Sequence, residues 1–442
     1  MFSTASQSLP LGSRASGVAL GSVIMVAVPV CLVSAKTIQI SLPLLLTATL
    51  LSVVIRREPS SRMRMSTSAA AMCLFVFILY AGCSSLWSPE PQATGLIVAM
   101  VAVIATGSLL LAQLLRTGRV EDLAHIREGL WIGLLVGLVY TVIEAASDQS
   151  IKIWVYNTLR LEPAMLEPSR FYTWLDGRVV AIHSDDLKRN AFSIPLLLWP
   201  ALMAAATIAS LRLRITVKLA LLALSFAAVA LSTSQTSKLA LVAGLTVYLV
   251  ARYSGQAARW GLSLAWALAC LGMVPAVLFL RHLELHNSTV LQLSAQLRIM
   301  IWNRIAQLVP AAPVFGVGAD MTYYIRPTMI EAPRGAPDWL GFPIPHPYNV
   351  YLQVWYELGL VGAVLLTAFG LLLLRQVGKL GKADRPFAYA TFAATAAAIS
   401  SSYNVWQIWF MCLFGFVAAM FALGQTQPDT CGSHATVGEK VS

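Results

Sequence analysis

The stretch PIPHPYNVYLQVWYELGLVG, residues 343–362, decides how this chain is interpreted. His346 stands between two prolines, which fix the backbone and disfavour a helix around the histidine. An apolar helical stretch follows at once and carries Glu357 in its interior, and Asn349 stands where a side chain can cap that helix. The pattern predicts a histidine held stiffly at the mouth of a membrane-spanning helix.

The composition is that of a membrane protein. Of 442 residues, 57% are hydrophobic and only 12% are charged, and the mean hydropathy is +0.71. Soluble proteins carry roughly a quarter charged residues, and a helical span needs about 20 apolar residues. About twelve stretches meet that need, so we expect an all-α polytopic protein with a single integral membrane domain over residues 1–442. They lie at about 17–34, 38–55, 69–86, 93–115, 128–147, 191–210, 216–232, 237–252, 261–280, 348–374, 387–401 and 404–424.

Basic residues predict the orientation, because Lys and Arg in short loops mark the cytoplasmic side. A basic loop follows every second stretch, so both termini, including the short tail 425–442, are expected to be cytoplasmic. Two long loops, 148–190 and 281–347, then lie on the outer face and are expected to contain short helices.

The two outer loops are basic although the charge rule predicts otherwise. Any single cation there could be an ordinary solvated charge, but the set indicates an anionic ligand on the outer face. The net charge of +11 alone does not, because it is mostly the topology signal, and nothing in it indicates nucleic acid.

The stretch quoted above contains two candidate residues with ionisable side chains, His346 and Glu357. His346 is expected near the positive end of the helix dipole, which favours the neutral imidazole that a general base needs. The alternative is an interfacial histidine that only hydrogen-bonds a loop. For Glu357 we favour a structural role, bonding a neighbouring backbone near Gly359 and Gly362, over a functional one.

A second stretch, SAQLRIMIWNRIAQLVP at 294–310, has the period of an amphipathic helix. Arg298 falls on its apolar side, one turn from Trp302, and an arginine there should be paired or hold an anion. Snorkelling toward solvent is the alternative. The helix ends near Pro310, and PVFGVGAD (313–320) predicts a tight glycine turn.

Two further stretches place cations at expected helix starts, where the dipole favours anions. STSQTSKLALVAGL (232–245) has hydroxyls that can satisfy the backbone and places Lys238 at the helix mouth. DDLKRNAFS (185–193) places Lys188 and Arg189 where the first outer loop enters its span. His183 with Asp185 and Asp186 is too weak a set to predict a metal site.

Several signals are missing. The sequence has no P-loop, no GxGxxG in a βαβ unit, no DxD-type pair and no GxSxG, and its six cysteines include no CxxC. Chemistry driven by ATP or a nucleotide sugar is therefore disfavoured, and no cofactor is predicted. A lipid diphosphate donor fits better, because its leaving diphosphate needs cations and its acceptor hydroxyl needs a base.

Three stretches resemble the O-antigen ligase/polymerase superfamily, in the same order and on the same predicted side. STSQTSKLALVAGL is similar to its hydroxyl-rich motif, which usually has arginine at the place of Lys238. RIMIWNRIAQLVPAAPVFGVGADM resembles its Arg-x-x-x-Trp helix and Pro-x-x-Gly-x-Gly turn. HPYNVYLQVWYELGLVG resembles its His-Asn-x-x-Leu-x-x-x-x-Glu-x-Gly signature, although Pro347 and Tyr348 separate His346 from Asn349 here. The motifs cover about residues 230–370.

The resemblance implies a metal-independent, inverting glycosyltransferase of the GT-C type in the bacterial inner membrane, with its site facing the periplasm. The donor would be a glycan on undecaprenyl diphosphate. His346 would be the base or would position the acceptor, and Arg298 and Lys238 would hold the diphosphate, with Arg189 and Lys188 as weaker candidates. Asn349, Glu357 and Trp302 would support the site.

Members of this superfamily differ in the acceptor. The ligase uses lipid A–core, the polymerase extends the carrier-linked chain, and protein O-oligosaccharyltransferases glycosylate Ser or Thr. We favour the ligase, because lipid A–core carries phosphates that suit additional outer cations. These are Arg160, Arg170, Arg178, Arg326 and Arg334. A transporter of lipid-linked sugars is the alternative from another class, but apart from Glu144 and Glu357 the spans lack the charges that a polar path needs.

Overall fold

The computed structural model describes residues 11–56, 68–160, 171–330 and 343–424. Each predicted span overlaps a helix in these ranges. Within the described residues, seven helices are long and apolar enough to cross a membrane. The chain is therefore a multi-pass membrane protein, and the number twelve stays a prediction. The matching helices are α1 (Leu11–Val33), α2 (Ile38–Ile55), α3 (Ala69–Cys83), α4 (Pro91–Arg116), α5 (Val120–Ala146), α8 (Ile194–Ala205), α9 (Leu211–Leu231), α10 (Gln235–Tyr253), α11 (Gly255–His282), α14 (Val350–Val377), α15 (Arg385–Ile399) and α16 (Ile408–Met420).

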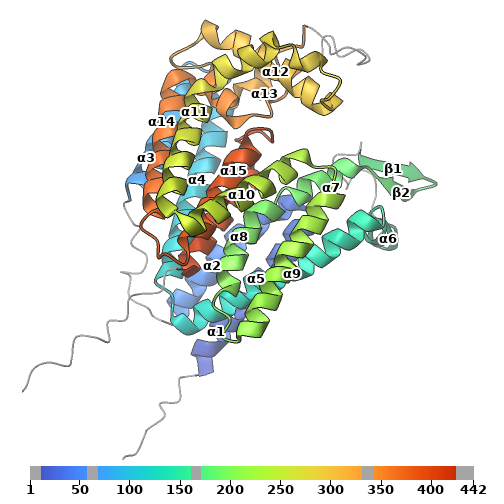
Figure 1. The fold of residues 1–442 in the computed structure, drawn as a ribbon, viewed down its shortest axis with the longest axis vertical. Helices are drawn as coiled ribbons and strands as arrows, with labels where there is room; N and C mark the ends of the chain where they lie inside the picture. The colour runs from blue at the N-terminus through green and yellow to red at the C-terminus, as the bar shows by residue number, and fades with distance from the viewer. Residues whose placement is uncertain (1–10, 57–67, 161–170, 331–342, 425–442) are drawn as a thin grey trace, which may run out of the picture.

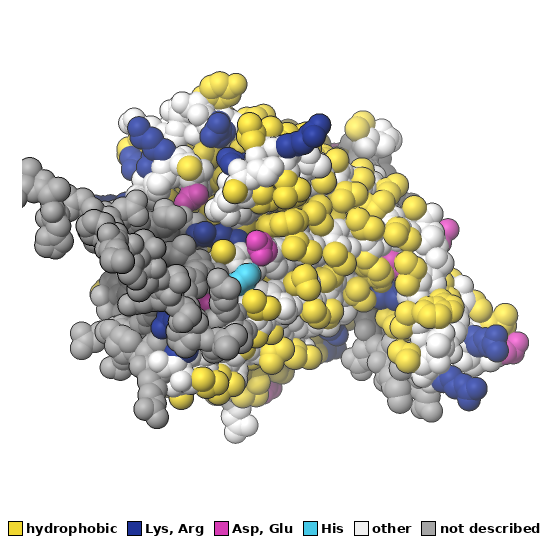
Figure 2. Space-filling model, turned by 90° about the horizontal axis from the view of Figure 1, so that it is seen from below, with side chains coloured by type: hydrophobic (Ala, Val, Ile, Leu, Met, Phe, Trp, Pro, Cys, Tyr) yellow, Lys and Arg dark blue, Asp and Glu magenta, His cyan; other side chains and the backbone are white. Residues whose placement is uncertain are grey.

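Helix α8 lies at the centre of the bundle. All of its residues are buried, and it packs against α5, α9, α10 and α15 (Figure 1). At 12 residues it is too short to cross a membrane alone, so it is a core helix that its neighbours shield. Apolar side chains cover much of the surface seen in Figure 2, with basic side chains mainly near the margins, as lipid-facing helices require.

Helices α1 and α5 approach each other closely along their backbones. A side chain at Gly129 of α5 would place its Cβ only 2.1 Å from the carbonyl oxygen of Gly21 in α1. One turn further along, Gly133 lies against the backbone of Met25 in the same way. Small residues at such spacing let membrane helices pack without intervening side chains.

One side of the bundle, which we call the outer face, carries α6, α7, α12 and α13. The second long loop holds α12 (Leu293–Leu308) and α13 (Met321–Ile325). The first holds α6 (Ser150–Thr158), β1 (Tyr172–Leu175), β2 (Arg178–Ile182) and α7 (Ser184–Ala191). Figure 1 shows α12 and α13 at the top and α6 with the two strands at the right.

The antiparallel pair β1–β2 departs from the expectation of helices alone. Leu175 pairs with Arg178, so Asp176 and Gly177 form a two-residue turn. Both turn residues have positive φ, 48° and 73°, which is the conformation that Asp-Gly turns adopt between antiparallel strands. The outer loops are therefore mixed in structure, while the bundle itself is helical.

Helix α14 is broken at Gly359, whose backbone (φ 62°, ψ −160°) is not helical. The glycine turn that starts at Pro313 docks against this break. The Gly318 amide donates to the Glu357 carbonyl at 2.8 Å, and the Leu360 amide donates to the Pro313 carbonyl at 2.9 Å. We call residues 313–322 together with 356–361 the seam. Its bonds satisfy backbone groups that a broken helix would otherwise leave unpaired in the membrane.

Candidate functional site

His346 lies just before α14. Asn349 caps that helix, since its side-chain oxygen accepts from the Leu352 amide at 3.0 Å. Burial lowers the pKa of His346 to about 4, so the imidazole is neutral at physiological pH. The expected neutral form therefore has burial as its cause, rather than the helix dipole. Among the residues that the structure describes, no group hydrogen-bonds Nδ1 of His346.

Tyr348 connects the histidine to α12. Its ring centroid lies 4.0 Å from that of His346, and the guanidinium carbon of Arg298 lies 5.9 Å from the same ring centroid. Trp302 holds the intervening turn, because its indole N–H donates to the Pro347 carbonyl at 2.8 Å. Tyr348 adopts a left-handed backbone (φ 56°), which costs energy for a side chain of this size. Of the two residues that depart from the motif, Tyr348 thus lies between His346 and Arg298, and Pro347 anchors the turn to Trp302.

Arg298 is half-buried on α12. Burial lowers its pKa, and the phenols of Tyr348 and Tyr403 act in the opposite direction. In the described ranges no carboxylate forms an ion pair with it. A guanidinium remains charged at physiological pH even so, which makes Arg298 a candidate to hold an anion.

The loop 400–407, between α15 and α16, contacts the first outer loop through Tyr403 and Arg189. Burial raises the pKa of Tyr403 to about 12, and Arg189, which donates a hydrogen bond to its phenol, opposes that shift. Arg189 also stacks over Phe171, with 5.5 Å between its guanidinium carbon and the ring centroid. Arg189 and Arg298 therefore approach one tyrosine from two different loops.

The placement expected for Lys188 and Arg189 was wrong in one respect. They lie in the last turn of α7, and the buried helix α8 begins only at Ile194. The sequence DDLKRNAFS forms its own short helix because a turn at Phe192 and Ser193 separates it from α8. Lys188 and Arg189 therefore do not lie at the start of α8, and the dipole of α8 gives no reason for an anion to bind beside Arg189.

Lys238 lies in the first turn of α10, whose cap is Ser234. Two residues earlier, Thr236 donates to the Ser401 carbonyl at 3.0 Å, so this helix start also abuts the loop 400–407. Lys238 is half-buried. We use the name outer cluster for His346, Tyr348, Arg298, Arg189, Lys238 and Tyr403.

Glu357 occupies the seam, where five donors converge on its carboxylate. It is fully buried, and it accepts from the amides of Asp320 and Thr322, each at 3.1 Å, and from the Thr322 hydroxyl at 2.6 Å. The Gln353 amide and the Trp406 indole donate at 3.1 and 2.6 Å. These bonds tie α14 to α13 and to the loop 400–407, which is a structural role.

The candidate acceptor cations are dispersed. Arg160 follows α6 and Arg178 begins β2, and both are exposed. Arg326 is also exposed and stacks on Tyr323, 5.0 Å from the ring centroid. Arg170 and Arg334 lie outside the described residues. The structure therefore does not bring the acceptor set together as it does the outer cluster.

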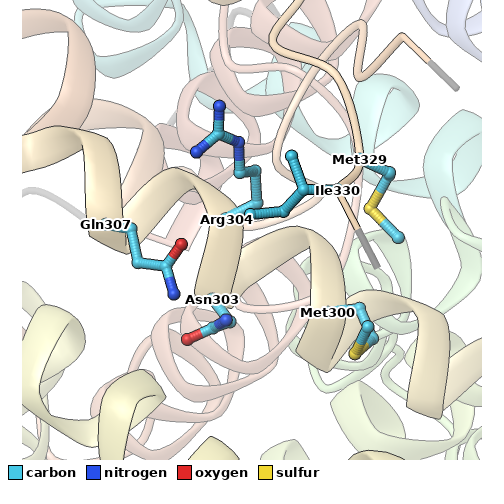
Figure 3. A pocket seen from close by; sticks show the side chains of 6 residues that line it. All are labelled: Met300, Asn303, Arg304, Gln307, Met329 and Ile330. Carbon is cyan, nitrogen blue, oxygen red and sulfur yellow. The ribbon is translucent and has the colours of Figure 1, made fainter. Parts of the chain in front are cut away.

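Two other features lie apart from the outer cluster. A small depression on α12 is lined by Met300, Asn303, Arg304, Gln307, Met329 and Ile330 (Figure 3). The weak metal set is split, because Asp186 forms an ion pair with Lys152 while His183 stacks on Phe171. Across the described ranges, no three His, Cys, Asp or Glu side chains gather at one point.

Sequence reasoning missed Tyr403 and its loop. Asn404 accepts from the Gln353 amide at 2.6 Å and donates to Asp320 at 2.8 Å, so the loop also braces the seam. Residues 400–407 read SSYNVWQ from Ser401 onward, a polar and aromatic run between two apolar stretches. Such a run, on the predicted outer side, could have marked the loop as part of the site.

The fold and the outer cluster define a class of protein, a multi-pass membrane protein that gathers a neutral histidine and several cations on one face. Residues 220–367 match the family described as O-Antigen ligase. That segment includes Lys238, Arg298 and His346 but neither Arg189 nor Tyr403. The match agrees with the resemblance found in the motifs: this segment, about a third of the chain, is similar to the O-antigen ligase family.

Curated proteins with similar sequences are putative polysaccharide ligases. The protein of Rickettsia conorii is 32% identical over 124 residues, which are 27% of this chain and 29% of that protein. That of Rickettsia felis is 30% identical over 122 residues (27% and 30%), and that of Rickettsia bellii 31% over 139 residues (31% and 33%). The similarity thus spans about a third or less of either chain.

Proposed function

We propose that this chain is an O-antigen ligase, a glycosyltransferase that moves O-antigen polysaccharide from undecaprenyl diphosphate to a sugar hydroxyl of lipid A–core. The observation that carries the proposal is the contact of a neutral His346 with Arg298 through Tyr348. It places a proton acceptor beside a charged guanidinium on one face of a membrane protein. Both residues lie inside the segment that matches the family.

In the proposed reaction, Arg298, Lys238 and Arg189 hold the donor diphosphate, with Lys188 as a weaker contact. The acceptor oxygen attacks the anomeric carbon from the side opposite the diphosphate, the bond from that carbon to the diphosphate breaks, and the configuration inverts. His346 takes the proton of the attacking hydroxyl. The cations neutralise the charge that develops on the leaving diphosphate, the role that a metal ion has in other transferases. The donor is already activated, so no cofactor is needed.

The remaining candidate residues support this arrangement. Asn349 fixes the start of α14, Trp302 fixes the turn after His346, and Glu357 fixes the seam below them. The proposal places the outer face in the periplasm, the protein in the bacterial inner membrane and both termini in the cytoplasm, with a GT-C-type fold of about twelve spans. The exposed Arg160, Arg178 and Arg326 suit the phosphates of lipid A–core.

Two other transferases would use the same donor site, an O-antigen polymerase and a protein O-oligosaccharyltransferase. The similarity to the putative polysaccharide ligases of Rickettsia supports the ligase. A transporter of lipid-linked sugars is the lesser alternative. It requires no proton acceptor, so it should tolerate loss of His346, whereas glycosyl transfer should not.

The test uses the purified protein in detergent, with EDTA and without nucleotide. Undecaprenyl diphosphate-linked O-antigen is mixed with lipid A–core and the products are separated on a gel. A ladder of capped lipid A–core that is lost in His346→Ala and kept in His125→Ala supports the ligase. Longer chains on the carrier would indicate the polymerase. No transfer by folded wild-type protein would overturn the proposed activity.

A further inference from the structure

Helix α6 leaves the bundle directly at the end of α5. Asp148 and Gln149 both have left-handed backbones (φ 50° and 62°), which turn the chain sharply between the two helices. The Gln149 side chain donates to the Ile182 carbonyl at 3.2 Å and so fixes the turn to β2. Figure 1 shows α6 projecting sideways from the bundle, with β1 and β2 beside it.

One face of α6 is held by the strands. Ile153 and Tyr156 pack against Val179 and Ile182, a small apolar cluster of their own. Asn157 exchanges two hydrogen bonds with the backbone of Val179, at 2.9 and 2.8 Å. This face explains why α6 is ordered although it is only 9 residues long.

Among the described residues, none covers the opposite face of α6 in this way. Trp154 is 66% exposed and Leu159 is 64% exposed. Ile151 and Val155 lie on the same side by helical spacing. The exposed Arg160 follows immediately. Within the described ranges, nothing in the molecule explains an outward-facing tryptophan at this place.

The surface that leads to this face belongs to α5. Val136, Val139 and Ile143 are exposed along the outer half of that spanning helix, with the spacing of one helical stripe. The stripe ends one turn before the chain bends into α6. An exposed stripe on a spanning helix faces lipid. The lipid that contacts this stripe of α5 therefore extends toward α6.

We propose that α6 is an interfacial helix, which lies in the outer-leaflet headgroup region with Trp154 and Leu159 toward the acyl chains and Arg160 on a lipid phosphate. Tryptophan is enriched at the membrane–water interface, and arginine beside it binds anionic headgroups. Lipid fits this face better than a protein partner does, because a spanning helix supplies the apolar surface up to it.

Helix α6 is also coupled to the outer cluster. Lys152 forms an ion pair with Asp186 in α7, one turn before Arg189. If the proposed function holds, the depth of α6 in the leaflet sets the height at which Arg189 meets a diphosphate carried by a lipid. This consequence rests on the proposed function, whereas the position of α6 does not.

The first test measures depth in nanodiscs of phosphatidylethanolamine with phosphatidylglycerol. Spin labels are placed by Trp154→Cys on α6 and, as the matched control, by Val180→Cys on the strands, after Cys83→Ser removes an exposed thiol. Power saturation should show the label at 154 more accessible to oxygen than to a nickel chelate, and the label at 180 the reverse. Equal access of both labels to the nickel chelate would overturn the proposal.

The second test addresses the phosphate. Phosphatidylglycerol should raise the melting temperature of the detergent-solubilised protein, and Arg160→Gln should remove at least half of that rise. Arg304→Gln on α12, an arginine outside both the outer cluster and the candidate acceptor set, should keep it. Loss by both variants alike, or by neither, would contradict a lipid phosphate at Arg160. Neither test uses a glycan substrate, so a failure here is distinct from a failure of the proposed transferase.

Discussion

Glu357 and His346 are both ionisable groups of the same stretch of sequence, 343–362, but their surroundings differ. The carboxylate of Glu357 is fully buried and receives five hydrogen bonds from residues of the seam and its neighbours. Nδ1 of His346 is buried as well, yet the described residues supply it with no partner. The seam is complete in itself, while the outer cluster is not.

The difference separates a stabilising group from a functional one. Buried polar groups in folded proteins are nearly always paired, so a group that stays unpaired needs an explanation. For Glu357 the protein provides every partner, and its loss should affect folding. For His346 and Arg298 the natural explanation is a ligand, and their loss should affect activity with little effect on folding.

The largest effect is expected from Gly316→Ala in the seam. A Cβ there would lie 2.3 Å from the Glu357 carbonyl, and the residue has φ 70°. The seam cannot close around it, so we expect a loss of more than about 4 kcal/mol and little folded protein. Gly272→Ala is the control, because no atom lies within 4 Å of its added Cβ. Yield and thermal unfolding in detergent measure both, and equal stability of the two variants would contradict the seam.

The next effect is expected from His346→Ala in the outer cluster. Loss of a general base should lower the rate of transfer by about 10²–10⁴-fold. The free energy of unfolding should stay within about 0.5 kcal/mol of the wild type, or rise, because a buried unpaired nitrogen is removed. A variant that loses activity only in proportion to its folded fraction would make His346 a structural residue like Glu357.

A smaller effect is expected from Arg298→Ala. Hydrogen bonds to charged groups contribute about 1.5–3 kcal/mol, so kcat/KM for the donor should fall roughly 10- to 100-fold. Arg298→Lys should recover part of this, because the charge returns without the planar fork. Transfer rates measured at increasing donor concentration give kcat/KM for both variants. A fall in kcat/KM for the acceptor alone would assign Arg298 to the acceptor site instead of the donor site.

The pH dependence sharpens the same comparison. His346 has a pKa of about 4 in the folded protein, below its ordinary 6.5, so it stays neutral until the pH approaches 4. Protonation removes the base, and kcat/KM should therefore hold from neutral pH to about 5 and fall below that. Stability linked to His346 is present above pH 6.5 and is lost as the pH falls toward 4, because the unfolded chain takes the proton first. An acid limb near pH 6.5 would contradict the buried neutral imidazole.

The smallest effect is expected from Lys238→Arg. Both side chains carry a positive charge, and the position is half-buried at a helix start, so activity should change by less than about twofold. Lys238→Ala should lower donor use several-fold. A severe loss in the arginine variant would show that the ammonium makes a contact specific to its shape.

Local patterns predicted much of the fold. Apolar stretches gave the helices, the position of Asn349 gave the cap of α14, and the glycine spacing after Pro310 gave the turn of the seam. The turn Asp176–Gly177 was also a local signal, flanked by strand-forming residues, and was overlooked.

Contacts between distant segments could not be predicted from the sequence. Arg189 and Tyr403 meet although they are 214 positions apart in the sequence, and no periodicity encodes such a meeting. The bond from Thr236 to Ser401 is of the same kind. The motifs identified Arg298 and His346 singly, but only the structure shows Tyr348 between them.

The seam also has a consequence for how the protein is made. Residues 313–322 leave the ribosome before Glu357, so the backbone donors of Asp320 and Thr322 are already present when the broken helix enters the lipid. Trp406 and Asn404 emerge later and add their bonds last. The chain therefore synthesises most donors to this carboxylate before the carboxylate itself, and the bond from Trp406 can form only when synthesis has passed the loop 400–407.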